Sequence, residues 1–183
     1  MNIREGLTVL DLGGQSEIWA NVPHPLNITI LNLPGVALAT VDSHHKLKYI
    51  TGDACNVVGI ENIKYDIVFS NSVIEHVGSQ EKQESFAKEV RRLGNSYWVQ
   101  TPSIWFPFEA HTGMPFWWFY PKSLQEHFIR RWKRNMPAWA EYIKETSVVT
   151  KERFIELFPE AHIYVETWFG IPKSYSVWHT AST

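Results

Sequence analysis

"TVLDLGGQSEIW", residues Thr8 to Trp19, sets the interpretation of the whole chain. A short apolar run ends in an aspartate and two glycines, which is typical of a buried strand followed by a tight turn. Ligands bind at this edge of open α/β sheets, and glycines there let the backbone approach a ligand closely. The G-x-G-x-x-G spacing of a dinucleotide-binding turn is absent, so the loop does not indicate a pyrophosphate site.

Segments of the same kind recur along the chain. Strands are predicted at Leu7–Leu12, Ile28–Leu33, Lys48–Asp53, Tyr65–Ser72 and Ser96–Pro102. Their near-continuous apolar character favours a parallel sheet that is buried on both faces. The last two strands, His162–Trp168 and Ser174–Thr180, are separated by five residues, too few for a crossover helix, so they form an antiparallel hairpin. The fold class is therefore α/β, a Rossmann-like, mostly parallel sheet of seven strands with an antiparallel C-terminal hairpin strand and helices on both faces.

Three helices follow from apolar spacing and capping residues. The first begins after Ser79, and Phe86, Ala87, Val90 and Leu93 share one face before Gly94. The second starts near Ser123, where "SLQE" has the pattern of a capping box. The third runs through Lys151–Phe158. No linker or repeat divides the chain, so residues 1–183 are expected to form a single domain.

Composition narrows the possible partners. The formal net charge of -2 argues against a nucleic-acid partner, which needs a basic surface. A single cysteine, Cys55, excludes an internal disulfide and a cysteine-based zinc cluster. Neither a signal peptide nor an apolar run long enough to cross a bilayer is recognised, so we expect a cytoplasmic location.

An aromatic segment, "SIWFPFEAHTGMPFWWFYP", follows the fifth strand. Its only ionisable residues are Glu109 and His111, which either face a substrate or form a hydrogen-bonded pair that fixes the loop. We expect an insert at about residues 103–140 to act as an aromatic lid. Contact with a membrane through the aromatics and the nearby "RRWKR" is less favoured, and an exposed aromatic lid would also suit a homodimer.

The motifs together resemble a known family. "VLDLGG", "TGDA", "YDIVFSNSVIEHV" and the final hairpin are similar, in this order, to class I S-adenosylmethionine-dependent methyltransferases, in particular small-molecule enzymes of the methyltransferase type 11 kind. The resemblance runs from Val9 to about Trp178. It implies S-adenosylmethionine (SAM) as cofactor, S-adenosylhomocysteine as product, and a small-molecule acceptor, with an oxygen acceptor slightly favoured.

The resemblance also implies the cofactor site. Asp53 would accept from the adenine amine, or it caps a helix instead. Asn32 stands where the family usually has an acidic residue for the ribose, so the charge is lost and Glu17 is a possible substitute. The implied cofactor residues are Asp11, Gly13, Gly14, Gln15, Glu17, Asn32, Leu33, Asp53, Ala54, Asn71, Ser72 and Val73.

Three residues are candidates to remove a proton from the acceptor. They are His111, Glu109 and His76, although His76 is equally suited to capping or packing. His24, His44 and His45 are scattered in predicted loops without partners at ligand spacing, so no metal is expected. Two other functions remain open: a non-enzymatic binding protein with a methyltransferase-like fold and, less favoured, a nucleotide-binding oxidoreductase.

Overall fold

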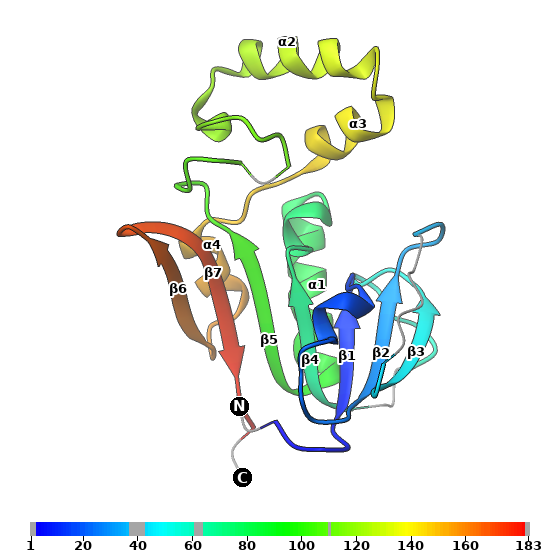
Figure 1. Cartoon of the computed structure of the whole chain (residues 1–183). Helices are drawn as coiled ribbons and strands as arrows, with labels where there is room; N and C mark the ends of the chain where they lie inside the picture. The colour runs from blue at the N-terminus through cyan, green and yellow to red at the C-terminus, as the bar shows by residue number, and fades with distance from the viewer. Residues whose placement is uncertain (1–2, 37–42, 61–63, 110, 182–183) are drawn as a thin grey trace.

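Seven strands form one sheet in the computed structural model, which describes residues 3–36, 43–60, 64–109 and 111–181. The strands are β1 (Thr8–Leu12), β2 (Asn27–Asn32), β3 (Lys46–Thr51), β4 (Tyr65–Asn71), β5 (Gly94–Pro102), β6 (His162–Trp168) and β7 (Ile171–His179). Their order in the sheet is β3-β2-β1-β4-β5-β7-β6 (Figure 1). The first five strands pair in parallel, and β7 runs antiparallel to both β5 and β6. The predicted fold class is confirmed.

The C-terminal hairpin is tighter than the sequence suggested. β7 begins at Ile171, three residues before the predicted start at Ser174, so only Phe169 and Gly170 separate it from β6. Both turn residues have positive φ angles, 47° and 79°. A two-residue turn with positive φ at both positions matches the right-handed twist of the strands it joins, which explains why pairing continues to the tip.

Two predicted helices pack on one face of the sheet. α1 (Gln80–Leu93) begins as expected after Ser79, whose side chain accepts a hydrogen bond from the Lys82 N–H. α4 (Lys151–Leu157) is capped in the same way by Thr150. Both helices contribute to the larger core, α1 through Phe86 and α4 through Phe154. This core also takes up Leu10, Leu12, Val68, Tyr97, Val99 and Val177 from the sheet.

The predicted capping box at "SLQE" is wrong. α2 (Lys122–Lys133) starts one residue before Ser123, and its N-cap is Pro121, with no side-chain capping bond. The fixed φ of proline suits a helix start and leads the chain into helical geometry before Ser123 can act as a cap. A further helix, α3 (Pro137–Glu145), was not predicted, and it also has proline in its first turn.

The second face of the sheet is covered differently. The 3-10 helix η1 (Ser16–Trp19) lies over β1, and Trp19 packs there with Val9, Ile28 and Ile67. Beside it, an apolar hollow of about 380 Å³ is lined by Trp19, Phe69, Trp98 and Trp178, among others. This part of the second face is therefore open in the described chain.

The segment between β5 and α4 rises above the carboxyl edge of the sheet (Figure 1). It contains η3 (Trp117–Phe119), α2 and α3. Trp117 is only 2% exposed, and its ring lies 5.3 Å from that of Trp132, so aromatic contacts hold η3 against α2. Within the described residues, no helix is both long and apolar enough to cross a membrane.

Candidate functional site

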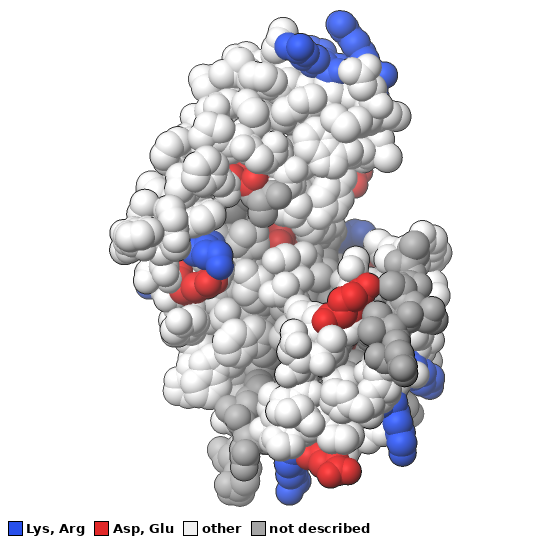
Figure 2. All heavy atoms as spheres, in the orientation of Figure 1, with Lys and Arg blue, Asp and Glu red and all other residues white. Residues whose placement is uncertain are grey.

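A cavity of about 850 Å³ lies between the carboxyl edge of the sheet and the aromatic segment. β4 and β5 provide one side, the β6–β7 hairpin another, and Phe106, Phe108 and Trp118 of the aromatic segment line it as well. Figure 2 shows a hollow in this region with acidic side chains inside it, while Lys and Arg gather at the upper end of the molecule. The cavity is thus large enough for a small molecule.

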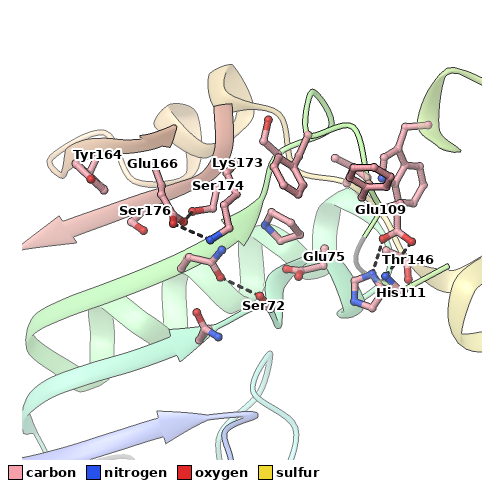
Figure 3. Close-up of a pocket in the computed structure, with 18 of the residues that line it drawn as sticks. Ser72, Glu75, Glu109, His111, Thr146, Tyr164, Glu166, Lys173, Ser174 and Ser176 are labelled. Carbon is pink, nitrogen blue, oxygen red and sulfur yellow. Dashed lines mark hydrogen bonds and ion pairs between the residues drawn. The ribbon is translucent and has the colours of Figure 1, made fainter. Parts of the chain in front are cut away.

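Polar residues of neighbouring strands form the floor of the cavity. Asn71, Gln100, Ser176 and Tyr164 are register partners across β4, β5, β7 and β6, so their side chains lie in one row. Nearer the edge, Lys173 Nζ donates to Glu166 Oε1 at 2.7 Å (Figure 3). The sequence interpretation missed Gln100 and the residues of the hairpin. Their alternation with apolar residues along β5 and β7 was the signal that could have revealed them.

The chain turns sharply at the end of β4. Ser72 has a φ of 56°, which is uncommon for a residue other than glycine. Its N–H donates to the Gln100 carbonyl at 3.1 Å, and its hydroxyl donates to Gln100 Oε1 at 2.9 Å. These two bonds to β5 hold the strained turn, so Asn71 and Ser72 are fixed at the cavity wall, as Figure 3 shows for Ser72.

Glu109 and His111 form the pair that the sequence suggested. Glu109 Oε1 accepts from His111 Nδ1 at 2.6 Å, and Oε2 accepts from the backbone N–H groups of His111 and Thr112. Burial opposes ionisation of Glu109, but these hydrogen bonds outweigh it and lower its pKa. The bond to Glu109 raises the pKa of His111. Both residues line the cavity, so the pair orders the loop and faces the cavity at once (Figure 3).

His76 lies behind this pair in η2 (Ile74–His76). Its Nε2 is 3.0 Å from His111 Nε2 and 2.7 Å from the Tyr142 hydroxyl, and its Nδ1 is 3.2 Å from Thr146 Oγ1. Burial, together with the charge of His111, lowers the pKa of His76 to about 4. His76 is therefore a neutral ring that is held on several sides.

Glu75 is a further cavity residue that the sequence interpretation did not include among its candidates. It is 1% exposed, and Oε2 accepts from the Thr101 hydroxyl at 3.1 Å. Oε1 is buried and has no hydrogen-bond partner among the described residues. Burial raises the pKa of Glu75 to about 7. An acidic residue in the apolar stretch "SVIEHV" was the available signal.

The glycine turn after β1 is built around Asp11. Gly13 has a φ of 75°, and a methyl group there would lie 2.7 Å from Val73. A methyl group at Gly14 would overlap the Asp11 carboxylate. Asp11 is fully buried; Trp19 Nε1 donates to its Oδ2 at 2.7 Å, whereas Oδ1 has no partner in the described chain. Neither position therefore has room for a side chain, and glycine is required at both.

The remaining predicted cofactor residues surround the ends of β2 and β3. Asn32 Nδ2 donates to the Gly14 carbonyl at 2.8 Å, a bond that a carboxylate could not make. Asp53 Oδ1 accepts from the Cys55 N–H at 2.8 Å in a turn, not at a helix start. Gln15, Glu17 and Leu33 are exposed, Ala54 is buried in the core, and Val73 packs beside Gly13. Of the twelve predicted residues, all of which are described, only Asn71 and Ser72 line the cavity.

Comparison with known proteins identifies the domain. The family model described as "Methyltransferase domain" matches residues 12–96, from the end of β1 into β5. This part of the chain is similar to a methyltransferase domain. No curated protein matches the chain.

Solved structures that share this fold include several methyltransferases. A SAM-dependent methyltransferase of Methanosarcina mazei is 12% identical, with a TM-score of 0.55, over 96% of this chain and 92% of that one. An O-methyltransferase family protein of Burkholderia thailandensis is 9% identical, with a TM-score of 0.57, over 97% of this chain and 52% of that one. A phosphoethanolamine N-methyltransferase of Haemonchus contortus is 13% identical, with a TM-score of 0.55, over 91% of this chain and 36% of that one. The chain therefore spans about half or less of the latter two proteins.

One feature of the turn after β1 fits the cofactor of such a fold. Asp11 Oδ1, which has no partner among the described residues, is an acceptor beside the two glycines, whose Cα atoms pack against Val73 and the Asp11 carboxylate. Asn32 differs from the acidic residue expected from the resemblance. Its amide stabilises the glycine turn itself, which gives this substitution a structural reason.

Asp11 should make the stability of the protein depend on pH. Burial raises the pKa of Asp11 from 3.8 to about 7, and the Trp19 hydrogen bond only partly opposes this. Between these two values the folded protein keeps a proton that the unfolded chain releases, so the free energy of unfolding falls as the pH rises and levels off above about 7. Asp11→Asn cannot titrate. In urea unfolding from about pH 5 to about pH 7, its stability should fall less steeply than that of the parent, by up to about 1.4 kcal/mol per pH unit. Equal slopes would contradict the buried proton.

Proposed function

We propose that the protein transfers a methyl group from SAM to a small molecule bound in the cavity. The observation that carries the proposal is the position of Asn71 and Ser72. They belong to the predicted cofactor site, and they also line the cavity that holds Glu75, Glu109 and His111. A cofactor whose methionine part reached these two residues would present its methyl group to the cavity. Methyl transfer needs this alignment more than strong acid or base help.

On the cofactor side, residues of the chain would bind SAM and orient it. The glycine turn and Asp11 would hold the amino acid part, and Asp53 with the Ala54 N–H would receive the adenine. Asn32 has its amide engaged with Gly14, so the ribose would rely on its remaining oxygen or on the exposed Glu17. When bound, SAM supplies a methyl group on a sulfonium, which is a good leaving group.

On the acceptor side, an oxygen nucleophile is favoured. A bond forms between the acceptor oxygen and the methyl carbon, the carbon–sulfur bond breaks, and the hydroxyl proton must leave. The end of the cavity that contains Glu75 and the Glu109–His111 pair is where the described residues can receive this proton. The amide group of Gln100 and the hydroxyl groups of Ser176 and Tyr164 can form hydrogen bonds with a polar molecule that receives the methyl group.

Thermal unfolding with and without ligands tests the cofactor. SAM and S-adenosylhomocysteine at about a hundred times their dissociation constants should add about 2.7 kcal/mol, or roughly 5–10 °C in the midpoint, and NAD should add nothing. Transfer of labelled methyl from SAM to matched hydroxyl and amine acceptors then tests the reaction. Binding without transfer to any acceptor would favour the non-enzymatic alternative, and no shift with either sulfur compound would overturn the proposal.

The aromatic segment completes the proposed architecture. We include it as a lid over a single domain, because Phe106, Phe108 and Trp118 face the cavity while Trp105, Phe116 and Phe119 are at least half exposed. The exposed rings are also the surface through which a homodimer would form. A cytoplasmic location, without nucleic-acid or membrane partners, remains our expectation from the sequence.

A further inference from the structure

Three electron-rich atoms meet at the inner end of the cavity. His76 Nε2 and His111 Nε2 lie 3.0 Å apart, and Glu75 Oε1 is 3.9 Å from His76 Nε2. All three ligand atoms lie within 4.8 Å of one another. Glu75 and His76 come from η2, whereas His111 comes from the aromatic segment, so the fold brings them together from distant parts of the sequence.

Hydrogen bonds determine which nitrogen of each ring carries the proton. His111 Nδ1 faces the Glu109 carboxylate at 2.6 Å and must donate to it, which leaves Nε2 with a lone pair. The Thr146 hydroxyl donates to the Tyr142 carbonyl at 2.9 Å, so it accepts from His76 Nδ1. The Tyr142 hydroxyl can donate to His76 Nε2. In neutral rings, both Nε2 atoms are therefore acceptors.

Two acceptors at 3.0 Å repel each other unless a cation lies between them. A proton on one ring would satisfy the two histidines, but it would leave Glu75 Oε1 as it is, buried and without a hydrogen-bond partner in the described chain. A metal ion bound to the two Nε2 atoms and to Glu75 Oε1 would give each of the three atoms a partner. Glu75 therefore distinguishes a metal ion from a shared proton.

We propose that Glu75, His76 and His111 bind a divalent transition-metal ion, with zinc as the closest chemical fit. Imidazole nitrogen suits zinc and its neighbours, whereas magnesium and calcium prefer all-oxygen sites. Zinc sites with two histidines and one carboxylate keep a further position open for water or substrate. Glu75 and His111 both line the cavity, so the open position faces the space assigned to the acceptor.

Zinc would take the single lone pair of His76 Nε2, so the Tyr142 hydroxyl, 2.7 Å from this atom, has to turn away from it. The other adjustments are small. Zinc–ligand distances of about 2.0–2.2 Å put the ligand atoms of a tetrahedral site about 3.3 Å apart, close to the separation of the two histidine nitrogens. The Glu75 carboxylate has to move toward them by about 1 Å. Glu109 already provides the carboxylate that commonly orients a metal-binding histidine through its other nitrogen. The inference goes beyond the proposed function and does not depend on methyl transfer.

Calorimetric titration of chelator-treated protein with Zn²⁺ tests the site. One equivalent should bind, Mg²⁺ should not, and His76→Ala and His111→Ala should each weaken zinc binding by at least about 100-fold. Glu109→Gln should weaken it by about 10–100-fold, because it disturbs the orientation of His111 and the position of its ring proton, which zinc must displace from Nε2. His127→Ala removes an exposed histidine of α2 and should change nothing.

A second measurement uses the unmodified protein and so does not depend on the folding of any variant. In protein labelled with nitrogen-15 at histidine, one equivalent of zinc should shift the ring nitrogens of two residues, assigned as His76 and His111, and leave the others in place. Failure of the unmodified protein to bind zinc would overturn the inference in favour of a shared proton. Binding that survives in the His76→Ala/His111→Ala double variant would overturn it in favour of another site.

Discussion

Gly14→Ala is expected to lower the affinity for SAM by about 100-fold and to destabilise the fold by about 1–3 kcal/mol. The added methyl group would overlap the Asp11 carboxylate, which is buried and held by Trp19. Asp11 cannot retreat into the sheet, so the turn must move instead. That movement displaces the Gly14 carbonyl from Asn32 and closes the space proposed for the cofactor. Ligand-induced shifts in thermal unfolding measure the first effect, and urea unfolding measures the second.

Gly52→Ala provides the matched control. Gly52 lies just after β3 at the same edge of the sheet, and a methyl group there would make only an ordinary contact with Leu31, at 3.4 Å. Its φ is outside the positive range, so alanine adds no backbone strain. The control should keep both its stability and its response to SAM. If Gly14→Ala bound SAM as tightly as Gly52→Ala, the cofactor would not contact this turn.

Glu109→Gln is expected to reduce kcat for methyl transfer by about 10²–10⁴-fold while the fold is retained. The amide keeps the size of the side chain and can still accept from the His111 and Thr112 N–H groups. Its NH₂ group would then face His111 Nδ1 and donate to it, so the ring proton would have to move to Nε2. His111 Nε2 would then present a proton, in place of a lone pair, to a molecule bound in the cavity.

The outcome separates two roles for Glu109. A residue that only holds the loop would affect stability but not the pH profile of kcat, whereas a residue that sets the protonation of His111 should change both kcat and its pH dependence. Glu141→Gln, which removes an exposed carboxylate paired with Lys133, is the control and should leave kcat unchanged. An unaltered rate in Glu109→Gln would mean that the form of His111 does not matter to the reaction.

The parts of the fold that follow from local pattern were predictable. β1, β2 and β4 are runs of mostly buried residues, and the Ser79 cap and the apolar face of α1 can be predicted directly from their spacing. α3 could not be predicted from local sequence pattern. It begins at Pro137 after a short irregular stretch, and its burial depends on Ala140 and Ile143 meeting the rest of the fold. The prediction for the start of α2 was wrong for a related reason, because Pro121 and not Ser123 determines where the helix begins.

The residues of the candidate site also differ in this way: some could be predicted from local sequence, and others could not. Asp11, Gly13 and Gly14 could be selected because a turn after a buried strand is a local feature, and Glu109 and His111 because they are isolated charges in an aromatic stretch. Glu75 gains its importance from Thr101 and His111, which are distant in sequence and meet it only in the folded chain beside the adjacent His76. The polar row on β5, β6 and β7 depends on strand register, which no single segment encodes.

Trp98 lines both the larger cavity and the apolar hollow of the second face. Its side chain therefore borders two spaces, one with several polar groups and one almost entirely apolar. A short polar molecule fits entirely on one side of it, whereas a molecule with a long hydrocarbon tail would have to pass this single side chain to reach Phe69 and Trp178. We therefore expect the side chain at this one position, in the strand β5, to limit the length of the molecule that the cavity admits.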